Sequence, residues 1–387
     1  MKILMIAPQP FFEPRGTPIS AYQRLHGLSS LNYEVDLVTY HIGNDVEMQG
    51  LTIHRIPNIP FIKSIDIGPS WAKVLLDILV FFKTIMMLLF NRYDVIHSHE
   101  EAAFFAAFLS KIFRTPHLYD MHSSLHQQFA NSKFGHYGIV VKIFDVLERW
   151  VINSCDSMLT IGTDLEERAI AIKPTVKQTR LENLPVHVIE PIPAQHVVSE
   201  LKCKLGLENK QIVVYTGTFE HYQGLDLLFD SAELAIKKNP DLHFVMVGGK
   251  PNQIDERKAQ VQEKGLNDYF TFVGAVSPAQ TLAYLEMAHM LVSPRTEGLS
   301  VPLKIYTYLC SGKPIVATKL LAHTQILNDS NSMLVEPEPE AFAEGILKLI
   351  HNPELGRSLG MEGQVIAKKK YSSENYFNRL KQVYQAL

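Results

Sequence analysis

A segment in the C-terminal half of the chain, RTEGLSVPLKIYTYLCSGKPIVAT at residues 295–318, combines a carboxylate, three cations and two glycines. We predict that a buried strand ends just before it, at Ser293, and that a helix runs from near Pro302 to Gly312. The first backbone N–H groups of a helix lack partners, and the helix dipole adds about half a positive charge there. This pattern indicates a phosphate-binding loop in front of the helix.

Three side chains extend this interpretation. Lys304 can reach a bound phosphate, and Glu297 can accept hydrogen bonds from sugar hydroxyls. Thr307 shares a helical face with Lys304 through its i+3 spacing, which brings its hydroxyl toward the same ligand. These residues also fit plainer roles: Glu297 and Lys304 could be solvated charges, and Thr307 a packing residue. Gly312, at the end of the helix, fits the role of a C-cap. Their place at the carboxyl end of a strand, where open α/β sheets bind ligands, favours the functional role.

The elements that would position these residues alternate along the chain. Residues 2–7 form a predicted strand, and a loop with Gly16 leads to a helix from near Pro18, for which Thr17 is the expected N-cap. Further strands are predicted at 33–41, 93–99, 116–122 and 157–163, with a helix at 102–113. This order predicts a parallel, doubly wound sheet.

A second series of the same kind follows a proline-rich stretch at residues 183–195. Strands are predicted at 211–217, 243–249, 269–276 and 289–294, and a helix at 224–238. We therefore expect an α/β chain with two Rossmann-like domains, 1–190 and 191–371. Residues 372–387 form a predicted helix with one apolar face, which must pack on another part of the chain. This face contains Tyr376, Phe377, Leu380, Val383, Tyr384 and Leu387.

The composition agrees with two ordinary globular domains. The 387 residues are 46% hydrophobic and 20% charged, and the net charge of −3 gives no general attraction to nucleic acid. The three cysteines, Cys155, Cys203 and Cys310, are scattered without zinc-like spacing and suit a reducing cytoplasm. The first residues lack the apolar core of a signal peptide and are predicted to be a strand.

The most apolar segment is WAKVLLDILVFFKTIMMLLFNRYD, at residues 71–94. Asp77 and Lys83 interrupt it before it reaches the about 20 apolar residues that a membrane-spanning helix needs. A core helix, a dimer contact and a helix on a membrane surface all fit this pattern. Residues 71–92 carry more apolar side chains than one buried helix face requires, so we expect a membrane surface to cover the rest. Basic and aromatic residues that suit such a surface are Lys63, Lys73, Lys83, Arg92, Trp71 and Tyr93.

Taken in order, these motifs resemble the retaining, metal-independent family 4 glycosyltransferases of GT-B fold. The resemblance runs through YDVIHSH, YTGTFEHYQGLDLLFDSAEL, VMVGG, FVGAV, SPRTEG and GKPIVAT. It implies two Rossmann-like domains that face a cleft, with a glycan or lipid-linked acceptor in the first and a nucleotide sugar in the second. It also implies that the last helix crosses back onto the first domain, and that the enzyme needs no cofactor or metal beyond its nucleotide-sugar substrate.

The resemblance assigns roles to particular residues, with three departures. Thr307 stands where the family has a ribose-binding glutamate, and Thr218 and Gln223 replace basic residues that meet the diphosphate. Arg295 and Lys304 are therefore expected to take over that contact. The implied catalytic residues are His122, Glu297 and Lys304. The implied donor-binding residues are Gly16, Thr17, Gly217, Thr218, Gln223, Gly248, Gly274, Val276, Arg295, Gly298, Leu299, Ser300 and Thr307.

The implied chemistry concentrates on the leaving group. Cleavage of the anomeric bond puts negative charge on the nucleotide diphosphate, which amides, a helix start and Lys304 or Arg295 would stabilise. No DxD sequence is present to hold a cation. His117, His122 and His126 raise a zinc alternative, but the glutamate of an HExxH motif is missing, so we expect no metal site.

Two other functions stay open at this point. The departures at Thr218, Gln223 and Thr307 would suit a catalytically silent protein that binds sugar nucleotides. Retained Glu297, Lys304 and His122 favour an enzyme. A nucleotide-sugar epimerase of GT-B fold is the third candidate, and the transferase-like order of motifs disfavours it.

Overall fold

The computed structural model describes residues 1–13, 16–65, 70–124, 138–188 and 190–387. The chain divides into two compact units, residues 1–183 with 374–387 and residues 184–373. The sequence placed these limits near 190 and 371.

The first unit contains a parallel sheet of seven strands in the order β3-β2-β1-β4-β5-β6-β7. Strand β1 lies inside it, with Ile3 opposite Val35 of β2 on one side and Val95 of β4 on the other. Its buried run from Ile3 to Ala7 is continuously apolar, as expected for a strand covered on both faces. The strands are β1 (Lys2–Ala7), β2 (Glu34–Thr39), β3 (Leu51–Arg55), β4 (Val95–His99), β5 (His117–Met121), β6 (Ser157–Thr160) and β7 (Gln178–Arg180).

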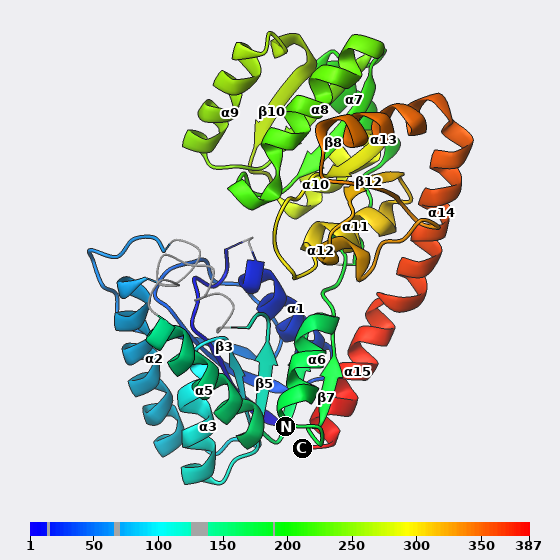
Figure 1. Ribbon diagram of the computed structural model, residues 1–387. Helices are drawn as coiled ribbons and strands as arrows, with labels where there is room; N and C mark the ends of the chain where they lie inside the picture. The colour runs from blue at the N-terminus through cyan, green and yellow to red at the C-terminus, as the bar shows by residue number, and fades with distance from the viewer. Residues whose placement is uncertain (14–15, 66–69, 125–137, 189) are drawn as a thin grey trace. The chain divides into compact units, whose positions relative to one another are not determined.

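Helices cover this sheet (Figure 1). They are α1 (Gly16–Ser30), α2 (Trp71–Phe90), α3 (Ala102–Phe113), α5 (Gly138–Ser154), α6 (Thr163–Ile172) and α15 (Ser373–Gln385). Leu4 and Ile6 of β1 pack in one apolar cluster with α2 and α3. Helix α1 begins at Gly16, so the prediction that Thr17 caps it is wrong: Thr17 lies inside the first turn. Among the described residues no helix is long and apolar enough to cross a membrane.

The last helix, α15, belongs to the first unit although it follows the whole second unit in sequence. Tyr376, Leu380, Val383 and Tyr384 are buried on its inner face. A Cβ on Gly27 of α1 would lie 2.6 Å from a Leu380 methyl carbon, so any larger residue there would displace the Leu380 side chain. The predicted packing of the C-terminal helix on the N-terminal domain is confirmed.

The second unit contains a parallel sheet of six strands in the order β10-β9-β8-β11-β12-β13. The strands are β8 (Gln211–Thr216), β9 (Leu242–Val247), β10 (Phe270–Gly274), β11 (Met290–Ser293), β12 (Ile315–Thr318) and β13 (Met333–Val335). The α-helices are α7 (Gln195–Leu205), α8 (Leu225–Lys238), α9 (Pro251–Glu263), α10 (Pro278–Met287), α11 (Leu303–Ser311), α12 (Leu321–Thr324), α13 (Pro339–His351) and α14 (Pro353–Lys370). Short 3-10 turns are η1 (Val186–Val188), η2 (His221–Gln223) and η3 (Asn267–Tyr269).

Both sheets have the doubly wound order that the sequence predicted. The strand order reverses between β1 and β4 in the first unit and between β8 and β11 in the second. Ligands in such sheets bind outside the carboxyl ends of the strands at this reversal. Each unit therefore has one place where a site is expected, beyond β4 in the first unit and between β8 and β11 in the second.

Candidate functional site

Three predicted glycines line the carboxyl edge of the second sheet. Gly217, Gly248 and Gly274 end or follow β8, β9 and β10, and the Gly248 N–H donates to the Gly274 carbonyl at 2.8 Å. A Cβ on Gly248 would lie only 1.9 Å from the Gly217 carbonyl oxygen. The strand ends thus pack backbone to backbone, which requires a residue without a side chain at Gly248. Val276, also predicted here, is instead half-buried against the apolar core.

Lys304, in the first turn of α11, places its side chain at the end of β8. Its Nζ donates to Gln223 Oε1 at 3.2 Å and lies 3.9 Å from the centroid of the Tyr215 ring. A Cβ on Gly217 would lie 3.4 Å from the same Nζ, so the glycine stands directly beside the ammonium group at the strand end. The structure therefore brings together Lys304, Gln223 and Gly217, three predicted residues from separate segments.

The environment of Lys304 opposes its positive charge. Although the residue as a whole is half-buried, its ammonium group is enclosed, and this burial lowers the pKa of Lys304 well below its ordinary value; nearby Arg295 lowers it further. No carboxylate in the described part of the chain forms an ion pair with Lys304. An anionic ligand would supply the missing counter-charge.

Arg295 braces the loop before α11. Its guanidinium donates to the carbonyl oxygens of Glu297 and Ser300, and Gln325 donates to that of Leu299 at 2.6 Å. Gly298 has φ +100, and a Cβ there would lie 2.4 Å from Arg295 Nη2, so only glycine fits. Three carbonyl groups of the loop thus accept hydrogen bonds from side chains of the same unit.

The amides of the same loop have no such partners. Within the described ranges, no hydrogen bond uses the backbone N–H of Gly298, Leu299 or Ser300. Helix α11 then begins at Leu303 with Pro302 at the N-cap, and Gly312 ends it at φ 70, as predicted. Free amides in the loop before a helix, followed by an enclosed lysine in its first turn, are groups with which a protein can bind phosphate.

Glu297 and Thr218 have different surroundings. Glu297 is exposed, and its Oε1 lies 3.8 Å from His221 Nδ1, so its carboxylate faces solvent, where it can meet a ligand. The Thr218 hydroxyl is buried without a hydrogen-bond partner, while its carbonyl accepts from Tyr215 at 2.7 Å.

Thr307 lies on α11 but points away from solvent. Its residue is 5% exposed, and its Oγ1 accepts the Val186 N–H at 3.1 Å. This contact ties η1 to α11 and gives a structural reason for a threonine at the position. The spacing along the helix predicted the shared face with Lys304 but gave no signal for a partner 121 residues away in sequence.

The substitution Thr307→Val tests this contact. It keeps the shape but removes the acceptor, so the half-buried Val186 N–H loses its partner and the second unit should lose about 1 kcal/mol of stability. Hydrogen exchange of the amides at 186–188 should quicken in Thr307→Val and stay slow in Thr307→Ser, which keeps the hydroxyl. Equal exchange in both variants would show that the hydrogen bond is unimportant.

In the first unit, predicted His122 follows β5 and contacts a second histidine. His122 Nε2 lies 2.8 Å from His99 Nδ1 and 3.4 Å from Asp120 Oδ1. Burial lowers the pKa of His122 to about 4 although Asp120 opposes the shift, so the ring is neutral at pH 7. A neutral imidazole held on one nitrogen can offer the other to a ligand.

Glu100, which the sequence analysis missed, lies at the same edge. It follows β4 and has a φ of 48°, a backbone conformation that few residues other than glycine and asparagine adopt. Thr17 donates to its Oε1 at 3.2 Å and Ser123 to its Oε2 at 3.1 Å. Burial, with repulsion from Glu101, raises the pKa of Glu100 to about 7. The only sequence signal was its place directly after a strand, in HSHE. Of the two residues predicted at the start of α1, Thr17 contacts Glu100 and Gly16 is the first residue of the helix.

A buried charged cluster lies beneath these residues. Arg24 Nε donates to Asp120 Oδ2 at 2.8 Å, with both side chains fully buried, and His97 Nδ1 lies 2.6 Å from the Tyr384 hydroxyl of α15. Burial opposes ionisation of Asp120, but Arg24 and the neighbouring histidines together outweigh it, so the pKa of Asp120 lies well below its usual range.

Three of these groups have the spacing of a metal site. Ligand atoms of His97, His99 and Asp120 lie within 4.8 Å of one another. The guanidinium of Arg24 already occupies the Asp120 oxygen that faces the histidines, and it would repel a cation. We therefore assign the cluster to packing of α15. Of the predicted zinc alternative, His117 contacts Ser98 Oγ at 2.7 Å and His126 lies outside the described residues.

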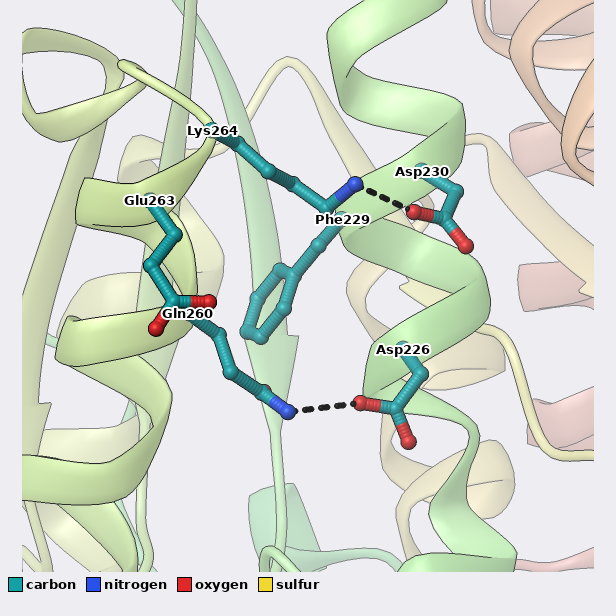
Figure 2. Close-up of a pocket in the computed structure, with 6 residues that line it drawn as sticks. All are labelled: Asp226, Phe229, Asp230, Gln260, Glu263 and Lys264. Atoms are coloured by element: carbon teal, nitrogen blue, oxygen red, sulfur yellow. Dashed lines mark hydrogen bonds and ion pairs between the residues drawn. The ribbon is translucent and has the colours of Figure 1, made fainter.

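A separate hollow of about 250 Å³ lies between α8 and α9, away from the residues above (Figure 2). Its polar side chains pair with each other: Lys264 Nζ lies 2.6 Å from Asp230, and Gln260 donates to Asp226 at 3.3 Å. Four of its five polar side chains are thus already paired, and we assign the hollow no ligand.

Comparison with known proteins covers both units. Residues 14–182 match the model of Glycosyltransferase Family 4, and residues 210–352 match that of Glycosyl transferases group 1. An alpha-D-kanosaminyltransferase of Streptomyces kanamyceticus is 24% identical over 88% of this chain and 90% of its own. A phosphatidyl-myo-inositol mannosyltransferase of Mycobacterium leprae is 22% identical over 100% of this chain and 97% of its own.

Solved structures agree on the architecture. Anabaena HepE in complex with UDP and glucose superposes with a TM-score of 0.79 at 16% identity, with 100% of both chains covered. Sheet topology, both family matches and these neighbours define the class: the chain is a glycosyltransferase of GT-B fold. Within this class it belongs to glycosyltransferase family 4, as its motifs indicated.

Proposed function

We propose that this glycosyltransferase moves a sugar from a nucleotide-sugar donor to a glycan or lipid-linked acceptor, with retention and without a metal. The single observation that carries the proposal is Lys304, an enclosed lysine without an acidic partner among the described residues, at the switch point of the second sheet. The donor diphosphate is the ligand that would complete its charge.

In this proposal the second unit stabilises the leaving group. The free amides of Gly298 to Ser300, the start of α11 and Lys304 would bind the diphosphate as its negative charge grows. Arg295 acts by holding the loop through its carbonyls, and Glu297 binds hydroxyls of the donor sugar. These groups are preorganised, so they would stabilise the charge without a cation.

The first unit would bind the acceptor. Neutral His122 and the enclosed Glu100 offer a nitrogen and a carboxyl group at one sheet edge, where a sugar hydroxyl can donate or accept. We place the acceptor at the inner face of a membrane, in polysaccharide or glycoconjugate synthesis, with contact through residues 71–92. The Mycobacterium leprae relative, named for a phosphatidyl-myo-inositol substrate, supports a lipid-linked acceptor.

The donor test begins with uridine nucleotides, because HepE was solved with UDP and with UDP-glucose. A panel of nucleotide sugars should contain one that raises the melting temperature, since a ligand at 100 times its Kd adds about 2.7 kcal/mol. The same compound should be slowly hydrolysed in the absence of acceptor. Binding without hydrolysis or transfer would favour the silent binding protein, and epimerised product would favour the epimerase.

A further inference from the structure

Helix α2 is apolar on two faces, although only one packs on the sheet. Leu76, Val80, Met87 and Leu88 are buried in the core of the first unit. A second stripe follows the outer face at spacings of three and four residues and is exposed between 40% and 80%. It contains Trp71, Leu75, Ile78, Phe82, Met86 and Leu89.

The neighbouring helices extend this exposed surface. Helix α3 adds Phe108 and Ile112, and α5 adds Ile139, Ile143 and Val146 with the i, i+4, i+7 spacing of one helical face. The three helices lie side by side (Figure 1).

Aromatic contacts join the helices in pairs. The rings of Phe81 and Phe105 lie 5.5 Å apart between α2 and α3, and those of Phe104 and Phe144 lie 6.0 Å apart between α3 and α5. The exposed apolar side chains thus belong to one layer of packed helices. They form a contiguous apolar surface, whereas the exposed apolar residues of an ordinary protein surface are scattered singly.

The unpaired charges on this layer are positive. Arg92, Lys111, Arg114 and Lys142 are exposed and form no ion pair within the part of the chain that the structure describes.

The acidic residues of the three helices are already engaged. Asp77 accepts from the Tyr40 hydroxyl, and both Asp145 and Glu148 pair with Arg168. The uncompensated charge of the layer is therefore positive.

We infer that α2, α3 and α5 form one docking face for an anionic lipid surface. A second copy of the chain would fit less well, because a two-fold contact of this face sets cations against cations. A bilayer with anionic headgroups offers acyl chains to the apolar stripes and negative charge to the four cations. The inference goes beyond the predicted contact of 71–92 because α3 and α5 contribute to it.

Vesicle co-sedimentation tests the face without any need for transfer activity. The whole chain should bind vesicles of phosphatidylcholine and phosphatidylglycerol (3:1) at low salt, and much less to pure phosphatidylcholine or at high salt. The triple variant Ile78→Ser, Phe82→Ser, Leu89→Ser should bind on the order of tenfold more weakly. The α5 variant Ile139→Ser, Ile143→Ser, Val146→Ser should also lose several-fold, roughly in proportion to the apolar area removed.

A matched control uses exposed apolar residues of the second unit. Ile192→Ser, Met361→Ser, Val365→Ser removes a similar apolar area elsewhere and should bind as the unchanged protein does. All these positions are exposed, so the variants should fold, which a melting curve checks.

Three results would overturn the inference: no binding to anionic vesicles, equal losses in the control, or unchanged binding of the α5 variant. Self-association abolished by the same substitutions, without vesicle binding, would assign the face to a dimer. A protein that binds vesicles but no nucleotide sugar would keep the docking face and remove the proposed donor.

Discussion

Lys304→Ala is expected to lower donor hydrolysis and transfer about 100- to 1,000-fold, the loss seen when one preorganised group is removed from a developing negative charge. Lys304 is the single cationic residue of α11, and its Nζ lies beside Gly217 and Gln223 at the end of β8. Because its ammonium group takes part in no ion pair with the described residues, its removal should leave the fold intact. Steady-state kinetics with the identified donor, together with a melting curve, measure both effects.

The protonation of Lys304 gives a second measurement on the same residue. Burial lowers its pKa in the free protein, and a bound diphosphate should raise the pKa again. Binding should therefore take up a proton at pH values between the two pKa values, and affinity should rise as the pH falls through that range. Calorimetry of UDP binding in buffers of different ionisation enthalpy measures the uptake.

Lys304→Arg is the matched control. An arginine stays protonated, so it should retain part of the activity while the proton uptake disappears. Full activity in Lys304→Ala, or unchanged uptake in Lys304→Arg, would remove Lys304 from the donor site. Glu297→Ala offers a further comparison, since its exposed carboxylate would contact the sugar and not the diphosphate.

The sequence predicted the part of this site that depends on local signals. A strand ending at Ser293, a helix capped by Pro302 and Gly312 and a lysine in its first turn follow from apolar pattern and turn residues, and the structure has all of them. The edge glycines were predicted from motifs. What these segments share is that each role is decided within about ten residues of chain.

Roles decided by distant partners could not be predicted in this way. Glu100 is enclosed by Thr17 and Ser123, which come from two other segments, and a glutamate after a strand gives no sign of that. Thr307 was assigned to a ligand because its helix face is predictable, whereas its acceptor is used by Val186. Burial of an arginine at position 24 is equally invisible, because an arginine in an amphipathic helix ordinarily lies at the surface.

Asp120→Asn is expected to destabilise the first unit by about 3 kcal/mol or more, because it leaves the buried Arg24 guanidinium without its counter-charge. Arg24 also donates to the Leu181 carbonyl at 2.8 Å and to the Tyr376 hydroxyl, so the loss should loosen α15 as well. Both tryptophans of the chain, Trp71 and Trp150, lie in this unit, so tryptophan fluorescence during urea unfolding reports on it alone.

The same change at a surface ion pair separates burial from charge. Asp45 pairs with Arg55 at 2.6 Å but is largely exposed, so Asp45→Asn should cost no more than about 1 kcal/mol. The pH dependence of this stabilisation follows from the depressed pKa of Asp120 in the folded protein. Ionised Asp120 contributes fully to the free energy of unfolding above its unfolded pKa of about 3.9. This contribution is lost as the pH falls through the lower folded pKa. Asp120→Asn should therefore lose its disadvantage in strong acid. If both variants unfold at the same urea concentration, the Arg24–Asp120 pair does not stabilise the packing of α15. The buried apolar face of that helix must then account for its packing on the first unit.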